Sequence, residues 1–223
     1  MIIPFGDDNI KGGHKPIVAY SFLIINILIF IIQLSLGIEV YHASVDNFSL
    51  TPQTVLNGQD IHTSITHMFL HGGLLHLIGN MIFLWIFGDN IEAIIGSVKF
   101  FIFYLASGLF AVAVHIYFDP ASNTPLVGAS GAIAGVMGAY IVMFPKSRIK
   151  VLIFIFKKNI PAFIFLGIWL GMQIMNVLQP VGDDEMSQVA WWAHIGGFIF
   201  GVLLGIVFNK FYPQRESRMV GIA

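Results

Sequence analysis

Residues 126–144 read LVGASGAIAGVMGAYIVMF, and Pro145 follows them. The stretch has no charged side chain and comes close to the roughly 20 mainly apolar residues that a helix needs to cross a bilayer. Proline cannot continue a helix, so we expect the segment to end at Phe144. The sequence therefore predicts a membrane-spanning helix, and its many small residues predict close contact with a neighbouring helix.

Five other segments are similarly long and apolar. They cover residues 17–36, 74–95, 100–118, 161–178 and 189–208, with ends set to within about 2–4 residues. The predicted fold is all-α, a polytopic membrane protein with a bundle of six transmembrane helices. We expect a single domain, 1–223, with a core over about 16–208 and short tails. Residues 17–36 are too many for the apolar region of a cleavable signal peptide, so we expect them to remain as a span.

The composition points the same way. Apolar residues make up 57% of the 223 residues and charged residues 10%, whereas a soluble domain carries about 25% charged residues. This composition excludes a soluble enzyme and a disordered chain, and the net charge of −1 excludes a nucleic-acid partner. The absence of cysteine excludes disulfides, thiolate metal sites and a cysteine nucleophile. The expected surrounding is the lipid bilayer.

The positive charges predict the orientation. With six spans, all eleven Lys and Arg residues fall on the side of the two termini, while acidic residues such as Asp46, Asp119 and Asp184 fall on the other side. Cytoplasmic loops are enriched in Lys and Arg, so we expect both termini in the cytoplasm. The longest hydrophilic stretch, residues 37–66, is then outside, and its Ile and Val content predicts an ordered loop.

Polar side chains in three of the predicted spans indicate chemistry, because polar groups in hydrocarbon are costly and usually functional. These side chains are His76 with Asn80, Ser130, and His194. At about 1.5 Å per residue, each lies within roughly 10 Å of the outer boundary. A serine hydroxyl needs an adjacent base to become a nucleophile, and His194 matches Ser130 in depth. With no Asp or Glu at this depth, we expect a dyad of nucleophile Ser130 and general base His194.

A site for the oxyanion is predicted beside this dyad. His76 and Asn80 are four residues apart and therefore share one helix face. The backbone N–H of Ser130 lies where a helix begins and has no partner inside that helix. We expect these three donors to stabilise the negative charge that develops during acyl transfer.

Helix packing is the alternative explanation for the same stretches. Small residues at such spacing usually mark close helix contacts. The predicted packing residues are Gly128, Gly131, Gly135, Gly197 and Gly201. Packing explains the glycines but gives no reason for His194. Close contact between the spans at 126–144 and 189–208 would also bring His194 to Ser130, so the two explanations are compatible.

Two other functions receive less support. His67 and His71 are four residues apart and, with His76, suggest metal ligands. No His-Glu-x-x-His motif and no suitably placed carboxylate completes such a site, so no metal is predicted. A channel or transporter is disfavoured because the chain has no inverted repeat and no acidic residue at the membrane midplane.

Three motifs, taken in order, resemble those of the rhomboid family of intramembrane serine proteases. Gly128-Ala129-Ser130-Gly131 is similar to the Gly-x-Ser-Gly of the nucleophile. Residues 193–201, AHIGGFIFG, are similar to the Ala-His-x-x-Gly-x-x-x-Gly of the base, and His76-Leu77-Ile78-Gly79-Asn80 to the His-x-x-x-Asn of the oxyanion site. The resemblance covers about 16–208, and the six-span count resembles the basic bacterial form.

The resemblance implies a serine-type endopeptidase that cleaves transmembrane segments of membrane protein substrates near the outer face, preferring small residues and using no cofactor or metal. It implies that water reaches Ser130 from outside and that residues 161–178 with 179–188 gate lateral access. The compact form suggests a bacterial cytoplasmic membrane. The alternative is a non-catalytic rhomboid-like protein that binds membrane proteins.

Two positions depart from the family pattern. Many members have Trp-Arg where this sequence has His62-Thr63, so we expect a different anchoring of the 37–66 loop. Many also have an aromatic residue four positions after the nucleophile, packed on the catalytic imidazole, where this sequence has Ala134. Either another ring braces His194 or the imidazole is held less tightly.

Overall fold

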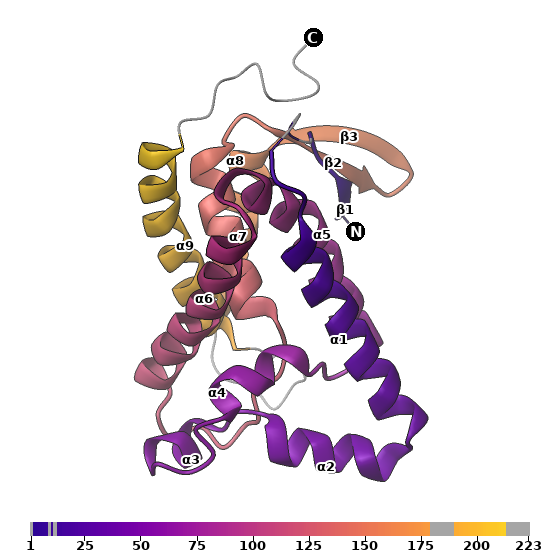
Figure 1. Ribbon diagram of the computed structural model, residues 1–223, viewed down its shortest axis with the longest axis vertical. Helices are drawn as coiled ribbons and strands as arrows, with labels where there is room; N and C mark the ends of the chain where they lie inside the picture. Colours follow the sequence, from indigo (N-terminus) through magenta and orange to yellow (C-terminus); the bar gives the residue numbers. More distant parts are fainter. Residues whose placement is uncertain (1, 9, 11–12, 179–189, 213–223) are drawn as a thin grey trace.

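The computed structural model is mostly helical, and it describes all residues except 1, 9, 11–12, 179–189 and 213–223 (Figure 1). Within that part of the chain, four helices are long and apolar enough to cross a membrane: α1 (Ile17–Ser35), α5 (Leu74–Ile95), α6 (Ser97–Phe118) and α9 (Trp191–Phe211). Two shorter apolar helices, α7 (Ser130–Met143) and α8 (Ala162–Val177), occupy the other two predicted spans. The prediction of a helical, multi-pass membrane protein is confirmed. Length and composition identify four of the six predicted spans, and the count of six is not confirmed.

Helix α7 begins at Ser130, later than predicted. Leu126 instead forms an antiparallel bridge with Leu50, with N–O distances of 3.1 and 2.7 Å, so this segment is tied to the loop between α1 and α5. Gly128 has φ of +121°, which no helix residue adopts. Gly128 therefore precedes the helix and does not pack within it, contrary to the prediction from sequence.

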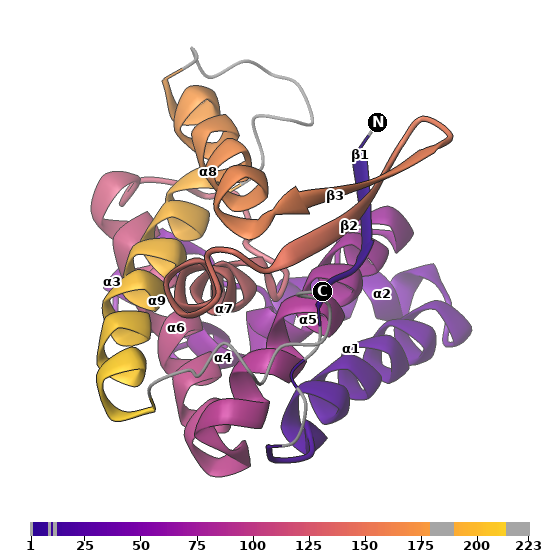
Figure 2. The ribbon, with the colours of Figure 1, turned by 90° about the horizontal axis from the view of Figure 1, so that it is seen from above.

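The short α7 lies in the middle of the bundle, where it contacts α5, α6, α8 and α9 (Figure 2). Most of its residues are buried. A helix enclosed by other helices does not have to match the thickness of the bilayer itself, because its ends are covered by protein. Its first residue, Ser130, can therefore lie inside the bundle.

Helices α7 and α9 touch through their backbones. A Cβ built on Gly197 would overlap the carbonyl oxygen of Gly131, and one built on Gly201 would overlap that of Gly135. Small residues permit helices to approach this closely. The contact holds the first turn of α9 beside the first turn of α7.

A three-stranded antiparallel sheet was not predicted. Its order is β1 (Ile2–Gly6), β2 (Arg148–Ile153) and β3 (Phe156–Pro161), and it lies at the end of the bundle where α9 finishes (Figures 1 and 2). Because β1 pairs with β2, the predicted N-terminal tail is part of the fold. The all-α prediction is thus wrong for these residues. Buried Ile149 and Val151 alternate with less buried neighbours, which is the period expected of a strand.

Residues 37–66 form an ordered loop, as predicted. They contain α2 (Ile38–Phe48), α3 (Pro52–Leu56) and α4 (Thr63–Thr66), and the 3-10 turn η1 (His67–Phe69) follows. Helix α2 lies across the direction of α1, at the end of the bundle opposite the sheet (Figure 1). At the first position that departs from the family pattern, His62 Nε2 lies 3.1 Å from the carbonyl oxygen of Asn47 and so links α2 to α4.

Buried carboxylates fasten the N-terminal segment to the bundle. Glu92 of α5 accepts hydrogen bonds from two backbone N–H groups in the first turn of α1, at 2.9 and 2.7 Å. Asp7, just after β1, accepts hydrogen bonds from the Tyr140 hydroxyl of α7 and, at 2.7 Å, from Asn90 Nδ2 of α5. Burial raises the pKa of Asp7 to about 6, because the charged form loses its hydration.

Candidate active site

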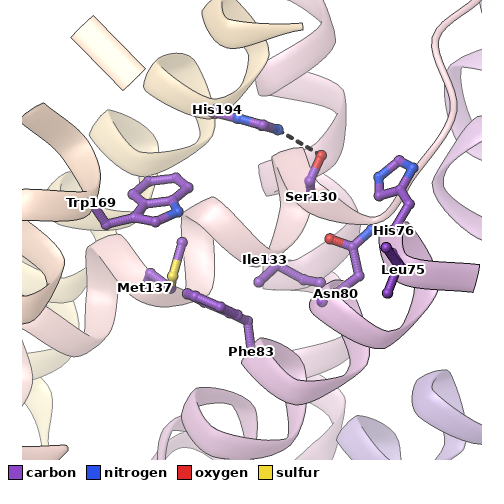
Figure 3. A pocket seen from close by; sticks show the side chains of 10 residues that line it. Leu75, His76, Asn80, Phe83, Ser130, Ile133, Met137, Trp169 and His194 are labelled. Carbon is purple, nitrogen blue, oxygen red and sulfur yellow. Dashed lines mark hydrogen bonds between the residues drawn. The ribbon is translucent and has the colours of Figure 1, made fainter. Parts of the chain in front are cut away.

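Ser130 and His194 meet inside the bundle. Ser130 is the first residue of α7, and His194 lies in the first turn of α9. Ser130 Oγ is 2.8 Å from His194 Nε2 (Figure 3). His194 is buried and Ser130 half-buried, so the hydroxyl faces accessible space while the imidazole is held by its surroundings.

The second ring nitrogen of His194 contacts a residue that the sequence analysis missed. His194 Nδ1 lies 2.8 Å from Oε1 of Gln173, which is on α8 and is itself buried. A carboxylate was the expected group for orienting the imidazole, but an amide oxygen accepts the same hydrogen bond. The available signal was an amide in the middle of a predicted span, because such a group is also costly in hydrocarbon.

Two tryptophan rings lie against His194. The ring of Trp169 on α8 is 5.9 Å away, centroid to centroid, and the ring of Trp191 on α9 is 5.8 Å away at an interplanar angle of 84°. Neither comes from α7, where Ala134 stands in place of the aromatic residue of many family members. The imidazole therefore contacts rings from α8 and α9 in place of one from α7. Of the two alternatives left open by the sequence, this is the one in which another ring braces His194.

His76 and Asn80 lie on the other side of the site, on α5 (Figure 3). A Cβ on Gly128 would come within 2.7 Å of His76 Nε2 and 3.4 Å of Asn80 Nδ2. Glycine at this position thus leaves room for the His76 ring, and its φ of +121° also favours glycine. Asn80 Nδ2 is buried and has no hydrogen-bond partner among the described residues, so a donor is available to a ligand.

The start of α7 adds backbone donors. The carbonyl oxygen of Ala129 accepts the first helical hydrogen bond, from Ile133 N at 3.0 Å. The first N–H groups of a helix have no partner inside it, and the helix dipole is positive at this end. The N–H of Ser130 therefore favours a negative charge placed next to the Ser130 hydroxyl.

The four polar residues of the site border one cavity of about 230 Å³, and they are Ser130, His194, His76 and Asn80 (Figure 3). Its remaining walls are mainly apolar and include Phe83, Ile133 and Met137. Water occupies about 30 Å³ per molecule in the liquid, so the cavity has room for several water molecules or one side chain of a substrate. The arrangement can place a polarised serine, a base and hydrogen-bond donors around one reacting group.

His67 and His71, which the sequence suggested as metal ligands, do not line this cavity. His67 Nδ1 lies 2.8 Å from the carbonyl oxygen of Thr63. Burial lowers the pKa of His67 to about 4 and that of His71 to about 3, because the charged forms lose hydration. In the part of the chain that the structure describes, no three His, Asp or Glu side chains are grouped as they would be around a metal ion.

The sequence was compared with models of known protein families. The sequence model of the Rhomboid domain matches residues 58–211, which is more than half of the chain and includes all four polar residues of the site. The chain belongs to the rhomboid family. The family resemblance drawn from the three motifs is thereby confirmed.

This rhomboid is similar to proteins from bacteria, plants and animals. It is 28% identical over 192 residues to Rhomboid protease GluP of Bacillus subtilis (strain 168), covering 86% of this chain and 36% of the relative. It is 31% identical over 153 residues to RHOMBOID-like protein 6, mitochondrial, of Arabidopsis thaliana, covering 69% and 45%. It is 29% identical over 142 residues to Presenilin-associated rhomboid-like protein, mitochondrial, of Bos taurus, covering 60% and 34%. The chain thus matches less than half the length of each of these relatives.

Proposed function

We propose that this rhomboid is an intramembrane serine endopeptidase, with Ser130 as nucleophile and His194 as general base. The observation that carries the proposal is the 2.8 Å contact between Ser130 Oγ and His194 Nε2 at the edge of the cavity. A serine hydroxyl becomes an effective nucleophile beside such a base. The glycines between α7 and α9 account for helix packing, but packing gives no reason for a histidine next to a serine.

The proposed reaction is peptide-bond hydrolysis in two steps. Ser130 Oγ attacks the carbonyl carbon of the scissile bond while its proton passes to His194 Nε2. The C–N bond then breaks, and His194 gives the proton to the leaving amine nitrogen. Water then attacks the carbonyl carbon of the resulting ester while His194 takes one of its protons. The bond between that carbon and Ser130 Oγ breaks, His194 returns the proton to Oγ, and the carboxylic acid is released. The scheme uses water and the side chains of this chain alone, without a cofactor.

We assign the oxyanion site to the side chains of His76 and Asn80 and the N–H of Ser130. The support is that Asn80 Nδ2 is buried with no partner among the described residues, next to a helix start that carries free N–H groups. A donor of this kind is most valuable when the carbonyl oxygen becomes negative, because the charge develops only in the transition state.

We place both termini in the cytoplasm and the site toward the outer face of a bacterial cytoplasmic membrane. The six proposed spans are α1, α5, α6, α7, α8 and α9. Helices α7 and α8 are too short to cross the bilayer by themselves, so neighbouring helices must cover their ends. The sheet and the end of α9 lie at one end of the bundle and carry Lys150, Lys158 and Lys210 (Figure 1). Lys and Arg are enriched on the cytoplasmic side, which supports this orientation.

The proposed substrates are transmembrane segments of other membrane proteins, cleaved near the outer face. The mainly apolar walls of the cavity suit an apolar segment, and the family resemblance implies a small residue at the cleavage site. The proposed lateral gate is residues 161–178 together with 179–188, the latter lying outside the described residues.

A fluorophosphonate probe, which reacts with activated serines, tests the proposal without a known substrate. We expect the detergent-purified wild type to be labelled and the variants Ser130→Ala and His194→Ala to remain unlabelled, with thermal unfolding checking that all three are folded. Labelling of Ser130→Ala at the wild-type rate, or no labelling of folded wild type, would refute the proposal. The absence of labelling would favour the alternative of a non-catalytic protein that binds membrane proteins, whereas labelling of Ser130→Ala would point to a different serine.

A further inference from the structure

Gln173 is a buried polar residue to which the proposed mechanism gives no role. It lies on α8, whose buried residues are Ala162, Leu166 and Gln173. Gln173 is 5% exposed. Burying an amide is costly unless its donor and its acceptor are both paired, so the partners of this side chain require an explanation.

The orientation of the Gln173 amide follows from its partners. Gln173 Nε2 donates a hydrogen bond to the carbonyl oxygen of Trp169 at 3.0 Å. A carbonyl oxygen can only accept, so the opposite orientation of the amide would set two acceptors against each other. The amide oxygen must therefore be the atom that lies 2.8 Å from His194 Nδ1.

This orientation determines the position of the proton on the imidazole. An amide oxygen has no proton to donate, so His194 Nδ1 must carry one. In a neutral imidazole the other nitrogen, Nε2, then presents a lone pair. That lone pair faces Ser130 Oγ at 2.8 Å, so the serine hydroxyl is the donor in this contact.

We propose that Gln173 is the positioning residue of the site. Its amide oxygen holds His194 in the tautomer with a proton on Nδ1, which leaves Nε2 free to accept the proton of Ser130. The catalytic meaning of this inference rests on the proposed function. A neutral amide here does what a carboxylate does in a Ser-His-Asp triad, but it adds no second charge to a buried site.

The hydrogen bond to Gln173 also suits the reaction step. When His194 takes the proton of Ser130 it becomes positively charged, and a charged N–H donor forms a stronger hydrogen bond than a neutral one. The bond from Nδ1 to Gln173 therefore stabilises the imidazolium more than the imidazole. Stabilisation that increases along the reaction is the kind that raises its rate.

The positioning group comes from a separate helix. Ser130 and His194 are on α7 and α9, which touch through their backbones, whereas Gln173 is on α8. Three residues of α8 are buried, compared with ten in α7. Helix α8 is therefore less closely packed than α7, and its placement decides whether His194 has its acceptor.

Three variants test the inference. Gln173→Met keeps the length of the side chain and removes the acceptor, and Gln173→Glu restores an acceptor. Asn176→Leu is the matched control, because Asn176 Nδ2 makes the same type of bond within α8, to Met172 O at 2.8 Å, without contacting the imidazole. We expect fluorophosphonate labelling to slow about 10- to 100-fold in Gln173→Met, the range for leaving one buried group unpaired. Gln173→Glu should recover part of this loss, because a carboxylate accepts from His194 Nδ1 but cannot donate to Trp169 O. Asn176→Leu should label within about 2-fold of wild type.

A spectroscopic readout does not depend on activity. In protein labelled with ¹⁵N in its histidine rings, the signals of His194 are identified by their loss in His194→Gln. At a pH where the imidazole is neutral, we expect a protonated Nδ1 and an unprotonated Nε2 in wild type, and exchange between both tautomers in Gln173→Met. An unprotonated Nδ1 in wild type, or wild-type tautomer and labelling rate in Gln173→Met, overturns the inference. If folded wild type is not labelled at all, the proposed function fails, while the spectra still decide the tautomer.

Discussion

Replacement of Gly201 by alanine tests the backbone contact that aligns Ser130 with His194. A Cβ at this position would overlap the carbonyl oxygen of Gly135 and would lie 2.6 Å from its carbonyl carbon and 2.8 Å from its Cα. Ordinary van der Waals contact begins at 3.4 Å, so the added methyl group is about 0.8 Å too close to the carbonyl carbon and overlaps the carbonyl oxygen by more than that. All three are backbone atoms, so relief requires α7 and α9 to move apart.

The expected loss of stability follows from two opposing effects. Overpacking of a tight contact costs about 1–3 kcal/mol, and we take the upper end because the clash is with backbone. Alanine is favoured over glycine in a helix by about 1 kcal/mol. The net destabilisation is therefore about 2 kcal/mol, which lowers Tm by roughly 4–8 °C in a chain of this size. Gly171→Ala is the matched control, because nothing lies within 4 Å of its Cβ and it should gain stability.

The same separation should slow the reaction of Ser130. The contact between Ser130 Oγ and His194 Nε2 is 2.8 Å, and a displacement of about 0.8 Å would take it beyond hydrogen-bond distance. A misplacement of about 1 Å can cost on the order of 100-fold in rate, so we expect labelling by the fluorophosphonate to slow 10- to 100-fold. Thermal unfolding and the labelling rate are measured on the same detergent preparations. A Gly201→Ala variant with the Tm and labelling rate of wild type would show that the contact does not align the site.

Three further outcomes are expected. Asp7 has a folded-state pKa raised to about 6 from 3.8, so between these values the unfolded chain releases a proton that the folded chain keeps. The contribution of Asp7 to the free energy of unfolding should thus fall by about 3 kcal/mol as pH rises from 4 to 6. Asp7→Asn should make the slope of stability against pH less steep over that range in unfolding curves, and an unchanged slope would contradict this role of Asp7. Asn80→Ala should slow fluorophosphonate labelling about 100-fold with Tm little changed, because it removes one oxyanion donor; an unchanged rate would remove Asn80 from the oxyanion site. Gly128→Ala should lower both Tm and the labelling rate, because φ is +121° there and a methyl group would lie 2.7 Å from His76 Nε2; a variant that behaves like wild type in both assays would contradict this role of the glycine.

Much of the fold could be read from local properties of the sequence. Segments of about 20 apolar residues predict membrane helices, because hydrogen bonds within a helix satisfy the backbone where no water is present. The prediction for residues 74–95 agrees with α5 at both ends. The sheet was missed because its strands are short and β1 lies far from β2 in sequence, so their pairing leaves little local signal.

The sequence by itself determined that this protein resides in a membrane and which polar residues to examine. Polar groups stand out in hydrocarbon whatever the packing, so Ser130, His194, His76 and Asn80 could be named before the structure. Tertiary structure alone decided that Gln173 faces His194 and that Gly128 makes room for His76. The reason is that helices apolar on nearly every side carry no periodic signal for the inward face. Their rotation is set by the close contacts of the folded bundle, which sequence spacing does not express.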